Sequence, residues 1–344
     1  MNDAIEECLK SADEALDLYL EAKDKRMEAY ELLAMASWHI QNGAPKKALT
    51  DAEDAMEIFQ FLRSPRENDA VNIIFYAHMA KGDAYRARKV ATSGVRRCQE
   101  GGDGRGEVQM LQLLVGLSSK EGEIAFLADP RSLKKYEEAL AYAEQALTVV
   151  RTVGDKRTET VLLNTICGLN LRLEQHDLAV LVGEECWELL QELGDAKHGA
   201  TIKLHMGNVM GMSSSTMTDL LFIMTHSYIK KDNLKKAVDF ATEMREYFQK
   251  QGDPKEEATA LMSICCTQCL LDQWDRAVTA ATSAQQLFLE AGDPNGEANA
   301  LRSLMEIAWK RGDHKGAVRM AERARALFRD TSDKRGEAAV LYCL

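Results

Sequence analysis

"AGDPNGEANAL", residues 291–301, concentrates glycine, acid and proline in one short loop. Such a loop could hold an ion, but it recurs. Close copies are "QGDPKEEATAL" (251–261), "TSDKRGEAAVL" (331–341) and "VGDKRTETVLL" (153–163). The aspartates Asp253, Asp293 and Asp333 are spaced by 40 residues, a period that is typical of repeat arrays. The stretch is therefore interpreted as the joint between two repeats.

The residues of this joint have the chemistry of a helix end followed by a helix start. Gly292 suits the left-handed conformation that closes a helix. Asp293 can cap the next helix, and Pro294 fits its first position, where no backbone donor is lost. Glu297 adds negative charge to the first turn, which the helix dipole favours. A helix is predicted to begin at each joint.

Each repeat is predicted to hold two helices, called helix A and helix B. In the repeat that starts at Asp293, helix A carries Leu301 and Leu304, and a break follows near Gly312. Helix B then places alanines at intervals of four and three residues and ends with an aromatic residue. That frame is Ala317, Ala321, Ala324 and Phe328, and it recurs at Ala48, Ala52, Ala55 and Phe59 and at Ala277, Ala281, Ala284 and Phe288. The alanine stripe would let neighbouring helices approach closely.

The alanine-to-phenylalanine ends of helix B resemble the tetratricopeptide repeat (TPR). Ala324 to Phe328, Ala284 to Phe288 and Ala55 to Phe59 carry the likeness. The repeat is longer than the usual 34 residues of that family and is similar to the long repeats of kinesin light chains and LGN-type proteins. The resemblance implies an all-α fold, an α-α superhelix of antiparallel helix pairs. The tryptophan and tyrosine of the family's helix A are mostly leucine and alanine in this sequence.

The whole chain, 1–344, is predicted to be a single array. Residues 1–22 match helix B of a partial repeat, and residues 333–344 match a partial helix A. The full repeats are predicted at 24–63, 64–102, 103–154, 155–194, 195–252, 253–292 and 293–332. An array that starts and stops within a repeat indicates either part of a longer chain or ends covered by a partner.

Two repeats contain insertions, at 119–134 and 207–222. Two interpretations remain open. The methionines Met206, Met210, Met212 and Met217 could form an adaptable contact surface. Alternatively, each insertion is a lengthened helix pair with a surface loop.

Composition and motifs argue against several functions. The net charge of −11 argues against general nucleic-acid binding, and no apolar run is long enough to predict a membrane span. Eight scattered cysteines and the lack of a secretory signal predict a cytoplasmic protein. "EGGDGRGE" (100–107) follows a helix and lacks the lysine and hydroxyl of a phosphate loop. No catalytic set is evident, so neither an enzyme nor a cofactor or metal is predicted.

The predicted function follows from the resemblance, in which helix A lines a concave groove that binds peptides. The chain is expected to be a scaffold for a protein or peptide partner; the alternative is a regulatory or sensor segment of a larger signalling protein or NTPase. The candidate binding residues on helix A are Asn164, Arg172, Met262, Asn299, Arg302, Trp309 and Lys310.

Overall fold

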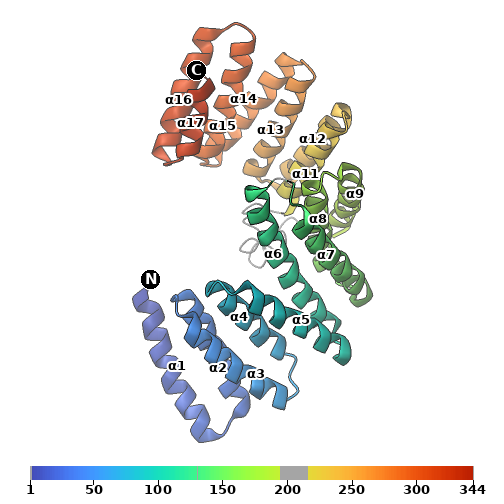
Figure 1. Cartoon of the computed structure of the whole chain (residues 1–344). Coiled ribbons are helices and arrows are strands. Elements are labelled where there is room, and N and C mark those ends of the chain that lie inside the picture. Colours follow the sequence, from blue (N-terminus) through green and yellow to red (C-terminus); the bar gives the residue numbers. More distant parts are fainter. Residues whose placement is uncertain (1, 130, 194–215, 344) are drawn as a thin grey trace. The chain divides into compact units, whose positions relative to one another are not determined.

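A computed structural model describes residues 2–129, 131–193 and 216–343. In these ranges the regular elements are all helices, and consecutive helices pack against one another over residues 2–153 and over residues 216–343 (Figure 1). The predicted all-α class is therefore confirmed. The helices are α1 (Asn2–Ala22), α2 (Lys25–Gln41), α3 (Pro45–Phe61), α4 (Glu67–Ala80), α5 (Ala84–Gly101), α6 (Gly104–Ala128), α7 (Lys134–Val153), α8 (Lys156–Arg172), α9 (His176–Leu193), α11 (Thr216–Lys230), α12 (Leu234–Gln251), α13 (Pro254–Leu270), α14 (Trp274–Glu290), α15 (Pro294–Lys310), α16 (His314–Asp330) and α17 (Lys334–Cys343).

The joints have the geometry that their residues predict. Gly292 has a φ of 66° and Gly252 a φ of 70°, both in the left-handed region. Asp293 Oδ1 accepts a hydrogen bond of 3.0 Å from the amide of Gly296, in the first turn of α15. Pro294 occupies that first turn, where it forgoes no helical hydrogen bond. The stretch at residues 291–301 is thus a helix joint, as predicted.

The alanine stripe of helix B lies in the core. Ala317, Ala321 and Ala324 of α16 are fully buried, and Phe328 is 1% exposed. They pack with Leu301 and Met305 of α15 in one apolar cluster. The small side chains allow close helix contact, and the terminal phenylalanine fills the wider space at the end of the pair.

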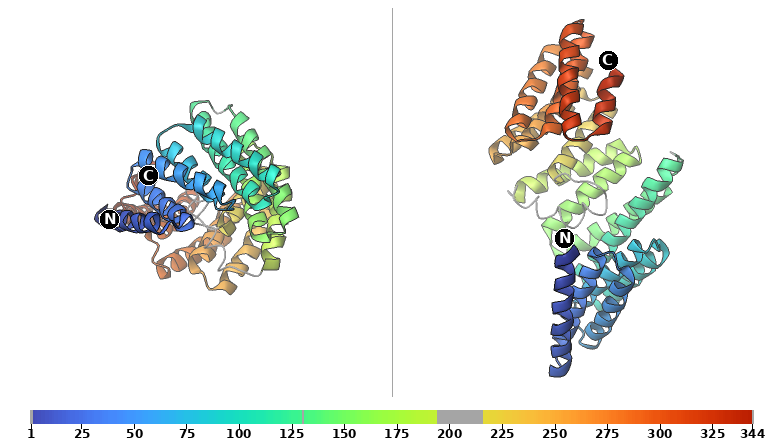
Figure 2. Two further views of the ribbon diagram at one scale, coloured as in Figure 1. Left: turned by 90° about the horizontal axis from the view of Figure 1, so that it is seen from below. Right: turned by 90° about the vertical axis from the view of Figure 1, so that its left-hand side faces the viewer.

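The chain divides into two compact units, Met1–Leu162 and Leu163–Leu344. Within the first, α1, α2 and α3 are successive antiparallel neighbours, as Figures 1 and 2 show. Within the second, α11 to α17 alternate as helix A and helix B, and the A helices α11, α13, α15 and α17 contact one another in that order. The predicted ranges 24–63, 64–102, 253–292 and 293–332 each hold one helix pair.

The first insertion lengthens a helix. Helix α6 continues to Ala128, and α7 begins at Lys134. Its extension is tied to the neighbouring helices by Arg88, which lies 2.7 Å from Glu121 and 2.5 Å from Glu138. The lengthened-helix interpretation is therefore correct for residues 119–128 of the insertion.

The second insertion is described only from Thr216, where α11 begins, so the predictions for Met206, Met210 and Met212 fall outside the described residues. Met217 is 5% exposed. The proposal that it forms a contact surface is wrong, because its position in the first turn of α11 turns it into the core.

Candidate functional site

In the second unit, one position of helix A can be followed from helix to helix by counting back from the end of each helix. The A helices α8, α11, α13 and α15 end at Arg172, Lys230, Leu270 and Lys310. The residues eight positions before those ends are Asn164, Phe222, Met262 and Arg302, which we call the register column. Tyr342 of α17 continues this column at the same 40-residue spacing and is 93% exposed.

The helices that carry the column are neighbours. Helix α13 contacts both α11 and α15, and α15 contacts α17. Gly168 of α8 faces α11 so closely that a Cβ there would lie 3.5 Å from Ile223 Cδ1. Burial and the Glu306 carboxylate of α15 raise the pKa of the Cys266 thiol on α13, which shows that these two faces adjoin. The column therefore runs across adjacent helices.

The column offers apolar and basic side chains to solvent. Phe222 is 63% exposed, and its ring stacks on His226, with the ring centroids 5.9 Å apart. Met262 is half-buried on the next helix. Arg302 pairs with Glu306 one turn later at 2.9 Å and remains half-exposed. An apolar segment and a charged segment thus lie side by side along the surface.

Asn164 adds an unused hydrogen-bond acceptor. Its Oδ1 atom is buried and accepts no hydrogen bond from the described residues. Asn72 stands eight residues before the end of α4, at the same register in the first unit, and its Oδ1 is also buried without a donor. Buried polar atoms are normally hydrogen-bonded, so these two carboxamide oxygens are exceptions within the described residues.

The other predicted residues occupy different surroundings. Arg172 is exposed at the end of α8, and Asn299 is exposed and donates to the Asn295 carbonyl at 2.9 Å. Trp309 is 45% exposed and lies edge-on to His314, with the ring centroids 4.5 Å apart. The Lys310 amine lies 5.4 Å above the ring of Trp274. The last two therefore contact the first residues of neighbouring B helices.

The sequence-based candidate list lacks Phe222 and His226. Phe222 is the last residue of the second insertion and His226 follows it, and the length of this repeat obscured the register. The 40-residue spacing from Phe222 to Met262 and from His226 to Cys266 is the sequence signal that could have identified both residues. Burial, with Lys230 and His176 nearby, lowers the pKa of His226 below its ordinary value. A neutral imidazole thus faces the Phe222 ring at neutral pH.

Burial raises the pKa of Cys265 to about 12 and that of Cys98 to about 11, so both remain thiols at neutral pH. The described histidines, cysteines and carboxylates form no group that could hold a metal ion. Of the helices that the structure describes, none combines the length and apolar character that a membrane crossing requires.

Comparison with known proteins confirms the fold. No protein-family model matches the sequence, and neither does any curated protein. The apo form of RapI is 12% identical over 91% of this chain and 79% of its own, with a TM-score of 0.61. A signal-transduction ATPase with a tetratricopeptide repeat sensor from Pyrococcus horikoshii is 12% identical over 94% of this chain and 46% of its own, with a TM-score of 0.60. A Rap protein complexed with competence and sporulation factor is 13% identical over 91% of this chain and 80% of its own, with a TM-score of 0.50. The fold of the chain is thus TPR-like, as the helix-B pattern predicts.

Proposed function

We propose that the chain is a non-catalytic scaffold of the cytoplasm that binds a peptide or helix of a partner protein on the register column. The observation that carries this proposal is the exposure of Phe222, Met262 and Arg302 at one register on three adjacent helices. Preformed helices hold these side chains in place, so less conformational entropy is lost when a partner binds.

The column also suggests which partner segment it would accept. Phe222 and Met262 present apolar surface to an apolar side chain, and Arg302 can pair with a carboxylate. A segment with an apolar residue followed by an acidic residue fits this order. The acidic net charge of the chain makes nucleic acid a poor partner.

Selection from a displayed peptide library on the intact chain tests the proposal. We expect the selected peptides to bind at least tenfold more weakly to the double variant Phe222→Ala/Arg302→Glu. The matched control is Leu181→Ala/Arg319→Glu, which makes the same two changes at exposed positions of the B helices α9 and α16. Equal weakening by both variants, or by neither, would show that binding does not use the column.

The alternative, a sensor segment of a larger signalling protein or NTPase, keeps the same binding surface. The fold that this chain shares with the Pyrococcus horikoshii ATPase supports this alternative. This chain spans less than half of that protein. The length of the protein made in its native cell decides between the two. A product of 344 residues contradicts the larger protein, and a longer product with an NTPase domain contradicts the free scaffold.

A further inference from the structure

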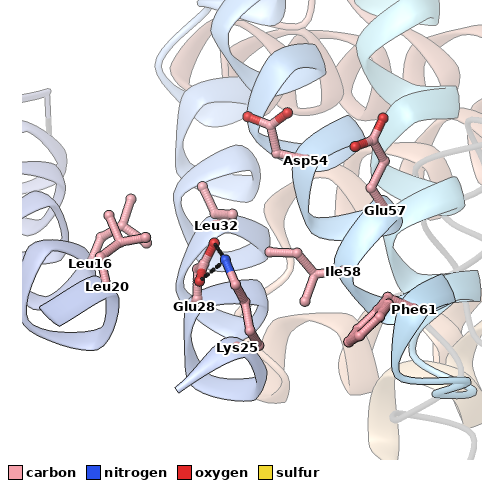
Figure 3. A pocket seen from close by; sticks show the side chains of 9 residues that line it. All are labelled: Leu16, Leu20, Lys25, Glu28, Leu32, Asp54, Glu57, Ile58 and Phe61. Atoms are coloured by element: carbon pink, nitrogen blue, oxygen red, sulfur yellow. Dashed lines mark hydrogen bonds and ion pairs between the residues drawn. The ribbon is translucent and has the colours of Figure 1, made fainter. Parts of the chain in front are cut away.

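The first unit contains an open apolar groove on α1, α2 and α3, separate from the register column. Its volume is about 610 Å³ (Figure 3). Leu20 is 47% exposed and Phe61 82% exposed, so much of its apolar surface faces solvent. The lining residues are Leu16, Leu20, Lys25, Glu28, Leu32, Asp54, Glu57, Ile58 and Phe61.

The second unit has a groove at the equivalent place, between α12, α13 and α14. Six of its lining residues lie 229 positions after lining residues of the first groove: Arg245, Glu257, Leu261, Ser283, Gln286 and Leu287. Its volume is smaller, about 340 Å³. Arg245 stands where the first groove has Leu16, and its Nε lies 3.2 Å from Glu257. The second groove therefore contains its own cation.

The same pairing recurs along the chain. The glutamate in the first turn of helix A usually binds a side chain from the preceding helix B. These pairs are Gln60–Glu67, Gln99–Glu107, Arg151–Glu159, Arg245–Glu257, Gln285–Glu297 and Arg325–Glu337.

Glu28 departs from this pattern. It is 7% exposed, and its described partner is Lys25 of its own helix at 2.8 Å. Lys25 contacts both carboxylate oxygens of Glu28, at 2.9 and 2.8 Å. A further cation would therefore share Glu28 with Lys25, as Arg329 of α16 shares Glu337 with Lys334.

The rim of the first groove is more acidic than that of the second. Asp54 and Glu57 of α3 replace Ser283 and Gln286, so two carboxylates line this groove in addition to Glu28 (Figure 3). Lys25 is the single basic residue in the lining. Negative charge around an apolar floor favours an apolar ligand that carries positive charge.

We propose that this groove docks a basic amphipathic helix of a partner protein. An arginine of that helix reaches Glu28, as Arg245 reaches Glu257, and its apolar residues cover Leu20 and Phe61. Asp54, Glu57, Ile58 and Phe61 follow helical spacing along about 10 Å of α3, which matches the face of a docked helix. A second copy of the chain, with its net charge of −11, would bring like charges together.

The test uses an alanine-based helical peptide with leucines at i and i+4 and arginines at i+3 and i+7, with its binding to the full chain followed by fluorescence anisotropy. Leu16→Arg should weaken binding at least tenfold, because the new guanidinium occupies Glu28 from within the chain. The matched control is Leu147→Arg, the same substitution at the same register of α7, where Arg151 already holds Glu159. It should leave binding unchanged.

A second variant distinguishes a loss of binding from a loss of folding. Phe61→Glu changes a side chain that is 82% exposed, so it should abolish binding without disturbing the core. Replacing the arginines of the peptide by glutamates should also abolish binding. Three results would overturn the proposal: no saturable binding to the unmodified chain, equal binding to Leu16→Arg, or self-association of the free chain that Phe61→Glu removes, since that would make a second copy the occupant.

Discussion

At the residue scale, the first-turn glutamates explain how successive helices are held in register. Glu297 is 4% exposed, and its carboxylate accepts from Arg323 at 2.7 Å and from Gln285 at 3.3 Å. An isolated buried carboxylate would be costly, so its partners must come from adjacent helices. Apart from Glu28, these glutamates thus tie the start of their helix A to a neighbouring helix B.

This contact predicts a pH dependence at the end of the chain. Hydrogen bonding from Arg329, aided by Arg325 and Lys334, lowers the pKa of Glu337 below its ordinary 4.5, although partial burial opposes the shift. Because the folded pKa lies below the unfolded one, the stabilisation is fully present above pH 4.5 and is lost as the pH falls through the folded value.

We therefore expect Glu337→Gln to speed amide hydrogen exchange in α17 at pH 7, and this difference from the unmodified chain to shrink as the pH falls below 4.5. Glu322→Gln, at an exposed site on α16, serves as the control. A difference that persists unchanged at low pH would show that the carboxylate charge does not hold α17.

Residue-level expectations succeeded where the chemistry is local. Gly292 and Asp293 act within one turn of the chain, so their types alone indicate a helix joint. The role of Glu297 was only half predicted, as a first-turn charge near the helix dipole. Its main partner, Arg323, lies 26 residues further on, and no local pattern indicates that distance.

At the element scale, the alanine stripe determines how closely helices A and B approach. Ala324 is fully buried on α16, whereas Ala326, two residues later on the same helix, is exposed. The two positions have the same residue type and nearly the same sequence surroundings. They therefore separate the effect of packing from the effect of helix propensity.

We expect Ala324→Leu to lower the free energy of unfolding by about 1–3 kcal/mol, because the larger side chain overpacks the contact with α15. Ala326→Leu should change it by less than about 0.5 kcal/mol, as is usual for surface substitutions. Urea unfolding followed by circular dichroism measures both. Similar losses for the two variants would mean that the stripe does not control packing.

Helix periodicity also shows where prediction at this scale fails. It predicted helix B correctly, because three alanines and a terminal phenylalanine mark one face. Periodicity could not predict the structure of the insertions, since "KEGEIAFLADPRSLKK" (120–135) can continue a helix or form a loop. Contacts from Arg88 of α5 to Glu121 and Glu138 favour the longer helix, and they join residues far apart in sequence.

At the scale of the whole molecule, the structure added a residue to the register column that repeat alignment had not predicted. Asn164, Met262 and Arg302 were predicted from repeat alignment, whereas Phe222 was hidden by the longer repeat before it. The groove at Glu28 was not predicted at all. Its character depends on Leu16, Asp54 and Glu28 lining one groove, which only the packing of α1 and α3 against α2 brings about.

Sequential packing also predicts that a core substitution destabilises only the helices near it. Helices in a repeat array contact their neighbours in sequence, so stability is nearly a sum of local terms. Phe59 and Phe328 are each 1% exposed, in the first and second units. Truncation to alanine should cost about 3–5 kcal/mol at either site. Phe328→Ala should speed amide hydrogen exchange in α15, α16 and α17 and leave α2 to α5 unchanged, and Phe59→Ala should do the reverse. Faster exchange throughout the chain in either variant would instead show that the two units unfold as one.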